Sequence, residues 1–377
     1  MRTWILFLWA TVLIAQVSVQ PRNSLAVAEH FLPDVNGLPR GENDPDLPAL
    51  LCRIALYTQS GIINASEGEE LVRHGLVLLS RNDAGDTPDT ATCLIALAKI
   101  HESKGQQKQS LQELEQALAV RERLFGPNHL LVADALNMLG LADYHRGRMS
   151  EAERAYGRAV EILRTQVPSA DLAAALSNLG NAMSAQGRVK EGEERTREAL
   201  SIWERLGGPD APSVAVGLTN LAVLLQMRKQ YDEAATLLGR ALKIDEKKYP
   251  ANHPRIGMDL NAAGVLAMAR KNYREAEDLL FRSATIVEKA LPSQDPEKGQ
   301  VLLNLGEAYR LEKKMGPAAD ALNRGLTTVM AAWDPNDIRL PIWMDKLALV
   351  LRSQEEFAAA QDLEIRADRI RTTHALH

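Results

Sequence analysis

Small residues recur along the chain in pairs, at an almost constant interval. The first members are Ala98, Gly140, Gly180, Ala222, Gly264, Gly306 and Ala348. Neighbouring members lie 42 residues apart, except for one step of 40. The second members keep the same spacing: Ser110, Ala152, Gly192, Ala234, Ala276, Ala318 and Ala360. Self-similarity at this period is typical of a solenoid, whose units bury their apolar faces only against their neighbours.

Each unit has the pattern of two helices. In the first, Leu is common four residues before and one residue before the small residue, as in Leu176 and Leu179. These positions share one helical face. The second helices are predicted to begin near Glu151, Glu191, Glu233 and Glu275, because acidic residues suit the first turn of a helix. Pro-rich segments such as 250–254 separate the units and stop each helix from continuing.

The N-terminus has the features of an export signal. Arg2 precedes an apolar run from Trp4 to Ala15, so residues 1–20 are predicted to be a signal peptide. The chain is therefore expected to be exported, to the periplasm or the exterior; an uncleaved, membrane-tethered N-terminus is the alternative. The domains predicted after it are a Pro/Gly-rich linker (21–45), a degenerate capping helix pair (46–87), seven repeats (88–371) and a short tail (372–377).

Composition argues against several functional classes. The formal net charge is −5, whereas nucleic-acid-binding proteins usually carry an excess of Lys and Arg, so nucleic acid is not an expected partner. The sequence has no Gly-x-Ser-x-Gly elbow, phosphate-binding Gly-rich loop or His-Glu-x-x-His pair, so neither an enzyme nor a cofactor is expected.

Two cysteines, Cys52 and Cys93, are too few for a usual structural zinc site, and no metal is expected. They fall on the first helices of adjacent units, where a disulfide could form in an oxidising compartment. The alternative, which the sequence favours, is two small buried residues.

The repeats resemble tetratricopeptide repeats, and most closely the 42-residue variety of kinesin light chains. The resemblance is carried by Asn178-Leu179-Gly180 and Asn304-Leu305-Gly306 in first helices, by Glu151-Ala152-Glu153 in a second helix, and by the loop Gly126-Pro127-Asn128-His129. It implies an all-α, right-handed superhelical solenoid of about eight antiparallel helix pairs.

The resemblance also implies that the first helices line a concave groove that holds a protein or an extended peptide. Carried over by position, the groove residues are Asn137, Tyr144, Ser177, Asn181, Val223, Gln226, Asn261, Val265, Met268, Glu307 and Arg310. Amide side chains there could bond a partner's backbone or simply face water. The apolar ones could contact a ligand or be buried between helices.

The function predicted from these features is a non-enzymatic, protein- or peptide-binding scaffold of the cell envelope or exterior. Beyond the signal sequence, no membrane contact is expected. The alternative is a structural spacer or self-assembly element that uses the convex face, with Tyr156, Leu237, Leu238 and Phe281 as candidate contacts. The sequence leaves the partner and the oligomeric state open.

Overall fold

The computed structural model describes residues 47–55, 64–81 and 86–375, and this part of the chain is all helical, with no strand. The predicted signal peptide and linker lie outside these residues. The helices are α2 (Leu47–Ala55), α3 (Ala65–Arg81), α4 (Pro88–Ser103), α5 (Gln107–Phe125), α6 (Leu130–His145), α7 (Met149–Arg164), α8 (Ala170–Ala185), α9 (Val189–Gly207), α10 (Pro212–Met227), α11 (Tyr231–Lys248), α12 (Pro254–Ala269), α13 (Tyr273–Ala290), α14 (Pro296–Leu311), α15 (Met315–Ala332), α16 (Leu340–Ser353) and α17 (Phe357–Ala375).

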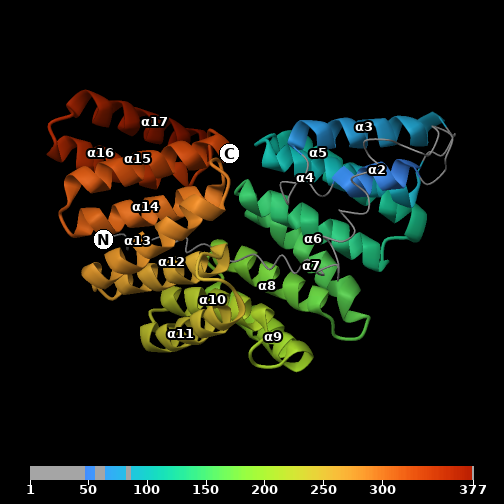
Figure 1. Ribbon diagram of the computed structural model, residues 1–377, viewed down its shortest axis with the longest axis horizontal. Coiled ribbons are helices and arrows are strands. Elements are labelled where there is room, and N and C mark those ends of the chain that lie inside the picture. The colour runs from blue at the N-terminus through green and yellow to red at the C-terminus, as the bar shows by residue number, and fades with distance from the viewer. Residues whose placement is uncertain (1–46, 56–63, 82–85, 376–377) are drawn as a thin grey trace. The chain divides into compact units, whose positions relative to one another are not determined.

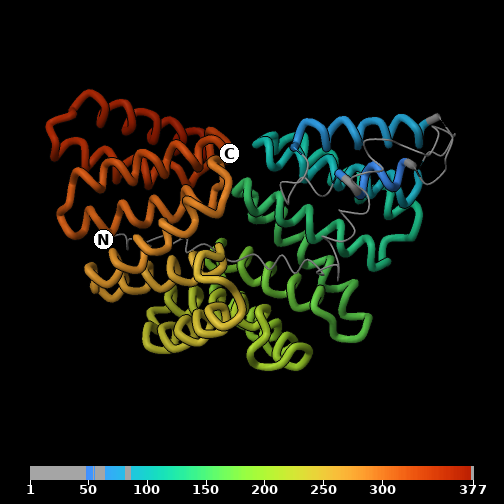
Figure 2. The backbone as a smooth tube through the Cα atoms, viewed as in Figure 1, coloured from blue at the N-terminus to red at the C-terminus, as the bar shows by residue number. Residues whose placement is uncertain are grey.

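The helices pack as consecutive hairpins, which confirms the predicted all-α fold of stacked helix pairs (Figure 1). In the second unit α10, α12, α14 and α16 each contact the second helix of their own hairpin, and α11, α13 and α15 each contact the next first helix. The tube in Figure 2 shows the short turn that joins the two helices of a hairpin. The second helices begin two residues earlier than predicted, at Met149, Val189, Tyr231 and Tyr273.

The described residues divide into two compact units. The first comprises the residues up to Tyr144 together with Ser150–Ala175, and the second comprises Leu176 onward together with His145–Met149. The first unit therefore holds α2 to α7, apart from the residues around the α6–α7 turn, and the start of α8. The second holds the rest of α8 and α9 to α17.

The recurring small residues mark the points where the two helices of a hairpin come closest. A Cβ atom on Gly264 would lie 2.6 Å from Leu280 Cγ, and one on Gly306 would lie 2.7 Å from Leu322 Cγ. In the first unit a Cβ on Gly140 would meet the Tyr156 ring at 2.8 Å. The side chain four residues after the second small residue thus packs onto the first one, which explains why both recur in register.

The turns between the two helices of a hairpin share one backbone conformation. Gly105, Gly147 and Gly187 have positive φ, and so do the equivalent Lys229, Lys271, Lys313 and Glu355. The N–H groups of the positive-φ residue and of the residue after it cap the first helix: Lys271 N donates to Met268 O and Asn272 N to Ala267 O, each at 2.9 Å. Side chains other than glycine are strained in this region of φ, so four repeats carry a small conformational cost.

Replacing Lys271 by glycine is therefore expected to stabilise the chain by about 1 kcal/mol, because the left-handed strain disappears. Lys271 is exposed, so little else changes. Urea denaturation measures the difference. The reciprocal variant Gly187→Ala should lose a similar amount, since its φ of 86° is equally left-handed and no neighbouring atom contributes. Equal stability of all three chains would contradict this account.

Cys52 of α2 and Cys93 of α4 form a disulfide, with Cα atoms 4.9 Å apart. The favoured interpretation of two free buried cysteines is therefore wrong, although both side chains are fully buried. The bond needs space on α3, since a Cβ at Gly75 would lie 2.8 Å from Cys52 Sγ. The degenerate capping pair α2–α3 is thus tied covalently to the first regular repeat.

Ion pairs at equivalent positions join successive second helices. Arg158 of α7 pairs with Glu122 of α5 at 2.5 Å, and Arg240 of α11 pairs with Glu204 of α9 at 3.0 Å. Arg158 also donates to Pro127 O, and Arg240 to Pro209 O. Arg324 repeats the pairing with Glu288. Because these side chains are partly exposed, each pair contributes little stability, but the backbone bonds fix the loop between repeats.

Candidate partner-binding surface

Most of the predicted groove residues are buried. In the second unit Ser177, Asn181, Val223, Gln226, Asn261, Val265, Met268 and Glu307 are buried, and Arg310 is half-buried. In the first unit Tyr144 is buried and Asn137 is half-buried. Because Val223 and Val265 are both under 5 % exposed, they stabilise the packing of the first helices. The assignment of these eleven residues to a binding surface stays a prediction.

Two of the predicted polar residues, Ser177 and Asn261, accept hydrogen bonds from the first helix of the next repeat. Asn220 Nδ2 of α10 donates to Ser177 Oγ of α8 at 3.0 Å, and Asn304 Nδ2 of α14 donates to Asn261 Oδ1 of α12 at 2.9 Å. Each bond joins first helices of successive repeats at the same register. The Asn that precedes the recurring Leu of the first helix thus supports the neighbouring helix in these two repeats.

Asn181 of α8 differs from these residues. Its side chain is 2 % exposed, yet neither Nδ2 nor Oδ1 has a hydrogen-bond partner. It follows Gly180, the small residue of its repeat, and so occupies the same register as Val223 and Val265. A buried amide has two donors and an acceptor to satisfy, and leaving them unpaired costs about 1–3 kcal/mol. Asn181 is therefore a costly residue for the free chain to keep.

Charged residues gather on α14 and α16. Arg310 donates to Glu307 through Nε at 2.7 Å and Nη2 at 3.0 Å, and Lys346 Nζ lies 3.2 Å from the same carboxylate. Lys346 Nζ also lies 4.3 Å from the centre of the Trp343 ring. Burial acts to raise the pKa of Glu307, but the Arg310 bonds and the Lys346 charge bring it below its ordinary value. Burial lowers the pKa of Lys346.

The sequence pattern missed Lys346 and Trp343. Lys346 lies two residues before Ala348 and Trp343 five residues before it, and neither offset belongs to the lining positions carried over from the family. The only sequence feature that pointed to this charged group was the predicted pair of Glu307 and Arg310. A third charge beside that pair could be found only from the packing of α16 on α14.

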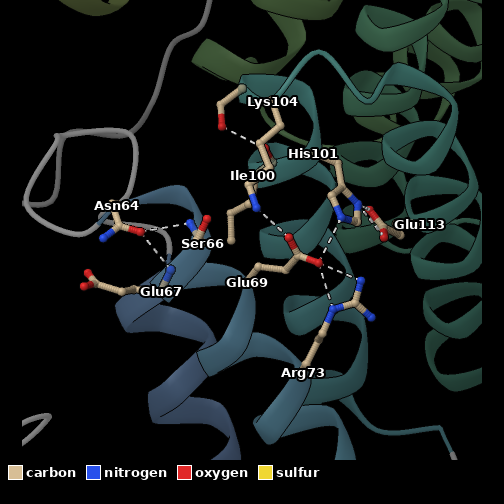
Figure 3. A network of polar contacts seen from close by, with 10 residues as sticks. Asn64, Ser66, Glu67, Glu69, Arg73, Ile100, His101, Lys104 and Glu113 are labelled. Carbon is tan, nitrogen blue, oxygen red and sulfur yellow. Dashed lines mark hydrogen bonds and ion pairs between the residues drawn. The ribbon is translucent and has the colours of Figure 1, made fainter.

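A second polar network lies in the first unit, where it joins α3, α4 and α5 (Figure 3). His101 Nδ1 lies 2.8 Å from the Glu113 carboxylate, and its Nε2 lies 3.6 Å from Glu69. Lys104 and Arg73 also pair with Glu69, at 2.6 and 2.7 Å. The Lys104 hydrogen bond, followed by that of Arg73, lowers the pKa of Glu69 to about 2. Burial raises the pKa of Glu113, which the His101 bond opposes.

This network tethers α3 of the N-terminal cap to α4 and α5 of the first regular repeat through charge-assisted bonds. Asn64 Oδ1 adds a local restraint, because it accepts from the backbone N–H groups of Ser66 and Glu67 and caps α3 (Figure 3). Within the described ranges no three His, Cys, Asp or Glu side chains are grouped so that they could hold a metal ion. None of the helices that the structure describes combines the length and the hydropathy of a membrane span.

Comparison with known proteins places the fold. Residues 108–165 and 171–247 match the family model described as tetratricopeptide repeat. A Rap protein complexed with Competence and Sporulation Factor has a TM-score of 0.58 at 16 % identity, over 87 % of this chain and 98 % of that one. The apo form of RapI has a TM-score of 0.56 at 12 % identity, over 93 % and 92 %.

A putative kinesin light chain from Podosopora anserina, with nearly identical TPR-like repeats, has a TM-score of 0.47 at 23 % identity, over 53 % of this chain and 96 % of that one. No curated protein matches the chain. The stacked hairpins define a helical-repeat protein. Residues 108–165 and 171–247 are thus similar to tetratricopeptide repeats, and the part of the chain that the structure describes continues the same helical-repeat fold on either side of them.

Proposed function

We propose that the chain is an exported scaffold that binds an extended peptide segment along the row of its first helices. The observation that carries the proposal is the unpaired amide of Asn181. Its two donors and its acceptor match the C=O and N–H groups of a peptide backbone, so a segment that displaces the side chains covering the amide would satisfy them. The amide would then fix the register of the segment, while side chains around it exclude water.

A bound ligand in a protein of the same fold supports this proposal. The Rap protein of similar fold was solved with Competence and Sporulation Factor bound to it. The charged group of Glu307, Arg310 and Lys346 lies on α14 and α16, within the same unit as Asn181. We infer that these residues favour segments that carry an acidic group, because Arg310 and Lys346 together outnumber the Glu307 charge.

Export is supported by the disulfide between Cys52 and Cys93. Disulfides persist in oxidising compartments such as the periplasm or the exterior and are rare in the cytosol. This agrees with the predicted signal peptide at residues 1–20. Fractionation of cells that express the full chain tests the location: recovery in the cytosol with both cysteines reduced would contradict it.

Replacing Asn181 by leucine is expected to have two opposite effects. The free chain should gain about 1 kcal/mol, because leucine has a similar volume and leaves no buried polar atom unpaired. Peptides selected on the wild-type chain from a random phage-displayed library should bind the variant about tenfold more weakly, since the amide no longer bonds their backbone. Thermal unfolding and titration calorimetry measure the two effects.

Asn220→Leu is the matched control, because Asn220 already has a partner in Ser177. It should lower stability. Unchanged peptide affinity in Asn181→Leu, combined with lower stability, would show that Asn181 has only a structural role. Aspartate substitutions at Val223 or Val265 would bury an unpaired charge and report on folding instead.

The second candidate function, self-assembly through the second helices, is favoured by one exposed aromatic. Phe281 of α13 is 56 % exposed, and Ile365 of α17, two repeats later at the same register, is exposed as well. Tyr156 and Leu238 are buried and Leu237 is half-buried, so these three other candidates have little free surface. Sedimentation velocity separates the functions: a monomer at all concentrations contradicts self-assembly.

A further inference from the structure

Two buried carboxyl groups face each other inside the second unit, where the second helix of one hairpin packs on the first helix of the next. Asp245 lies near the end of α11 and Asp259 in the first half of α12, and they are 0 % and 1 % exposed. Arg255 donates to Asp245 Oδ2 through Nε at 3.0 Å and Nη2 at 2.9 Å. Thr219 of α10 donates to Asp259 Oδ1 at 2.8 Å. The pair thus connects α10, α11 and α12.

The other oxygen of each carboxyl group has no partner. Asp245 Oδ1 and Asp259 Oδ2 are both buried acceptors without a donor. Two ionised carboxylates beside a single guanidinium would leave an excess negative charge out of contact with water, which is strongly unfavourable. One proton between the two free oxygens would remove the excess charge and satisfy both atoms at once.

We propose that Asp259 holds a proton that it donates to Asp245, and that loss of this proton loosens the packing of α10, α11 and α12. The packing of these three helices is then pH-sensitive: it is more stable while the carboxyl pair holds one proton and less stable once both groups are ionised. The position of the pair in the middle of the second unit means that the effect reaches the packing of three consecutive helices.

Several other titratable or polar groups face the pair. From α10 there is Thr219, from the end of α11 Tyr249, and from α12 Arg255 and its neighbour His253. Glu297 of α14 interacts electrostatically with Arg255 and with Asp295, the residue before α14, and so acts on the pair through Arg255. Burial, followed by the charge of Asp245, raises the pKa of Asp259 to about 7, while Arg255 and Thr219 oppose the increase. Burial and then Asp295 raise the pKa of Glu297 to about 7.

The remaining neighbours also affect the charge around the pair. Burial raises the pKa of Tyr249 and of Asp295 and lowers that of His253. Because Glu297 titrates in the same range as Asp259, the pH dependence of the wild-type chain alone does not isolate the pair. A variant that removes only the Asp259 titration is needed.

Asp259→Asn is that variant. Its amide can donate to Asp245 and accept from Thr219, so both bonds survive without a titrating proton. A carboxyl group whose pKa is higher in the folded chain than in the unfolded chain contributes its full stabilisation at pH values below its pKa in the unfolded chain. That contribution is lost as the pH rises through its pKa in the folded chain. Between pH 5 and pH 8 the unfolding equilibrium constant of the wild type should therefore increase roughly tenfold or more relative to that of Asp259→Asn.

Chemical denaturation at a series of pH values measures this difference. Asp278→Asn, at an exposed position of α13, is the matched control and should follow the wild type. Parallel pH profiles of the wild type and Asp259→Asn would overturn the proposal. If Asp259→Asn fails to fold, carbon-13 labelling of the aspartate carboxyls in the wild type decides. A carboxyl carbon that titrates near neutral pH in the wild type, and at a higher pH in Thr219→Val, supports the pair; titration of all aspartates at about pH 3–5 overturns it.

Discussion

Replacing Cys52 and Cys93 together by alanine is expected to lower the free energy of unfolding of the N-terminal cap by about 4 kcal/mol. The disulfide closes a loop of 41 residues, and in the chain-entropy model a loop of that length restricts the unfolded chain by this amount. The cap is short, because α2 has only nine residues and an isolated helix of that length is marginal in water. Without the bond, α2 should detach before the rest of the chain unfolds.

Hydrogen exchange of α2, α3 and α4 measures the loss. Exchange should quicken there and stay unchanged in α14 to α17, because each repeat of a solenoid depends mainly on its neighbours. The Glu69, Arg73, Lys104 and His101 contacts still hold α3 against α4, so α3 should open less than α2. Reduction of the wild type by dithiothreitol is the control and should reproduce the variant. Exchange that is equal in oxidised and reduced chains would contradict the prediction.

The disulfide also shows where sequence reasoning stopped. Cys52 and Cys93 were correctly placed on the first helices of adjacent units, α2 and α4. The degenerate repeat between them gave no reliable register, however, and disulfide formation depends on a Cα separation of a few ångströms. The free space that Gly75 provides beside Cys52 is a property of the α3 packing, and the sequence pattern does not contain it.

The repeat pattern predicted the helices well because the interaction that creates it is local. Gly264 and Leu280 belong to one hairpin, so their contact recurs wherever the spacing recurs. The start of a second helix was less certain, since Glu275 marks a first turn and not its first residue: α13 begins at Tyr273.

The candidate surface was predicted less well, because burial depends on contacts between repeats. The distance of Val265 along the sequence from the recurring small residue identifies the helix face on which it lies. That distance does not tell how closely the first helix of the next repeat covers the side chain. For the same reason Asn181 and Asn261 have the same apparent chemistry in the sequence, whereas the structure gives Asn261 a partner in Asn304 and leaves Asn181 without one. The sequence analysis did not single out Asp259, although it is the one carboxyl residue of the mostly apolar helix α12 and such residues are rarely buried without a partner.

Replacing Gly192 by alanine is expected to destabilise the chain by about 3 kcal/mol, even though alanine is the better helix former. A Cβ at this position would lie 2.0 Å from Ser184 Oγ and 2.3 Å from Gly180 O, so α8 and α9 must separate. The backbone of Gly180 cannot move away freely, because its carbonyl already accepts a 2.7 Å hydrogen bond from Ser184. Urea denaturation measures the loss.

Gly239→Ala is the matched control for this prediction. Gly239 also lies inside a second helix, α11, but no atom lies within 4 Å of its added Cβ. Only the helix propensity changes there, so this variant should gain up to about 1 kcal/mol. The two substitutions are chemically identical and should differ in sign, because one glycine is required by the contact between two helices and the other is not. A gain in stability in both variants would show that the recurring small residue is not required for close packing.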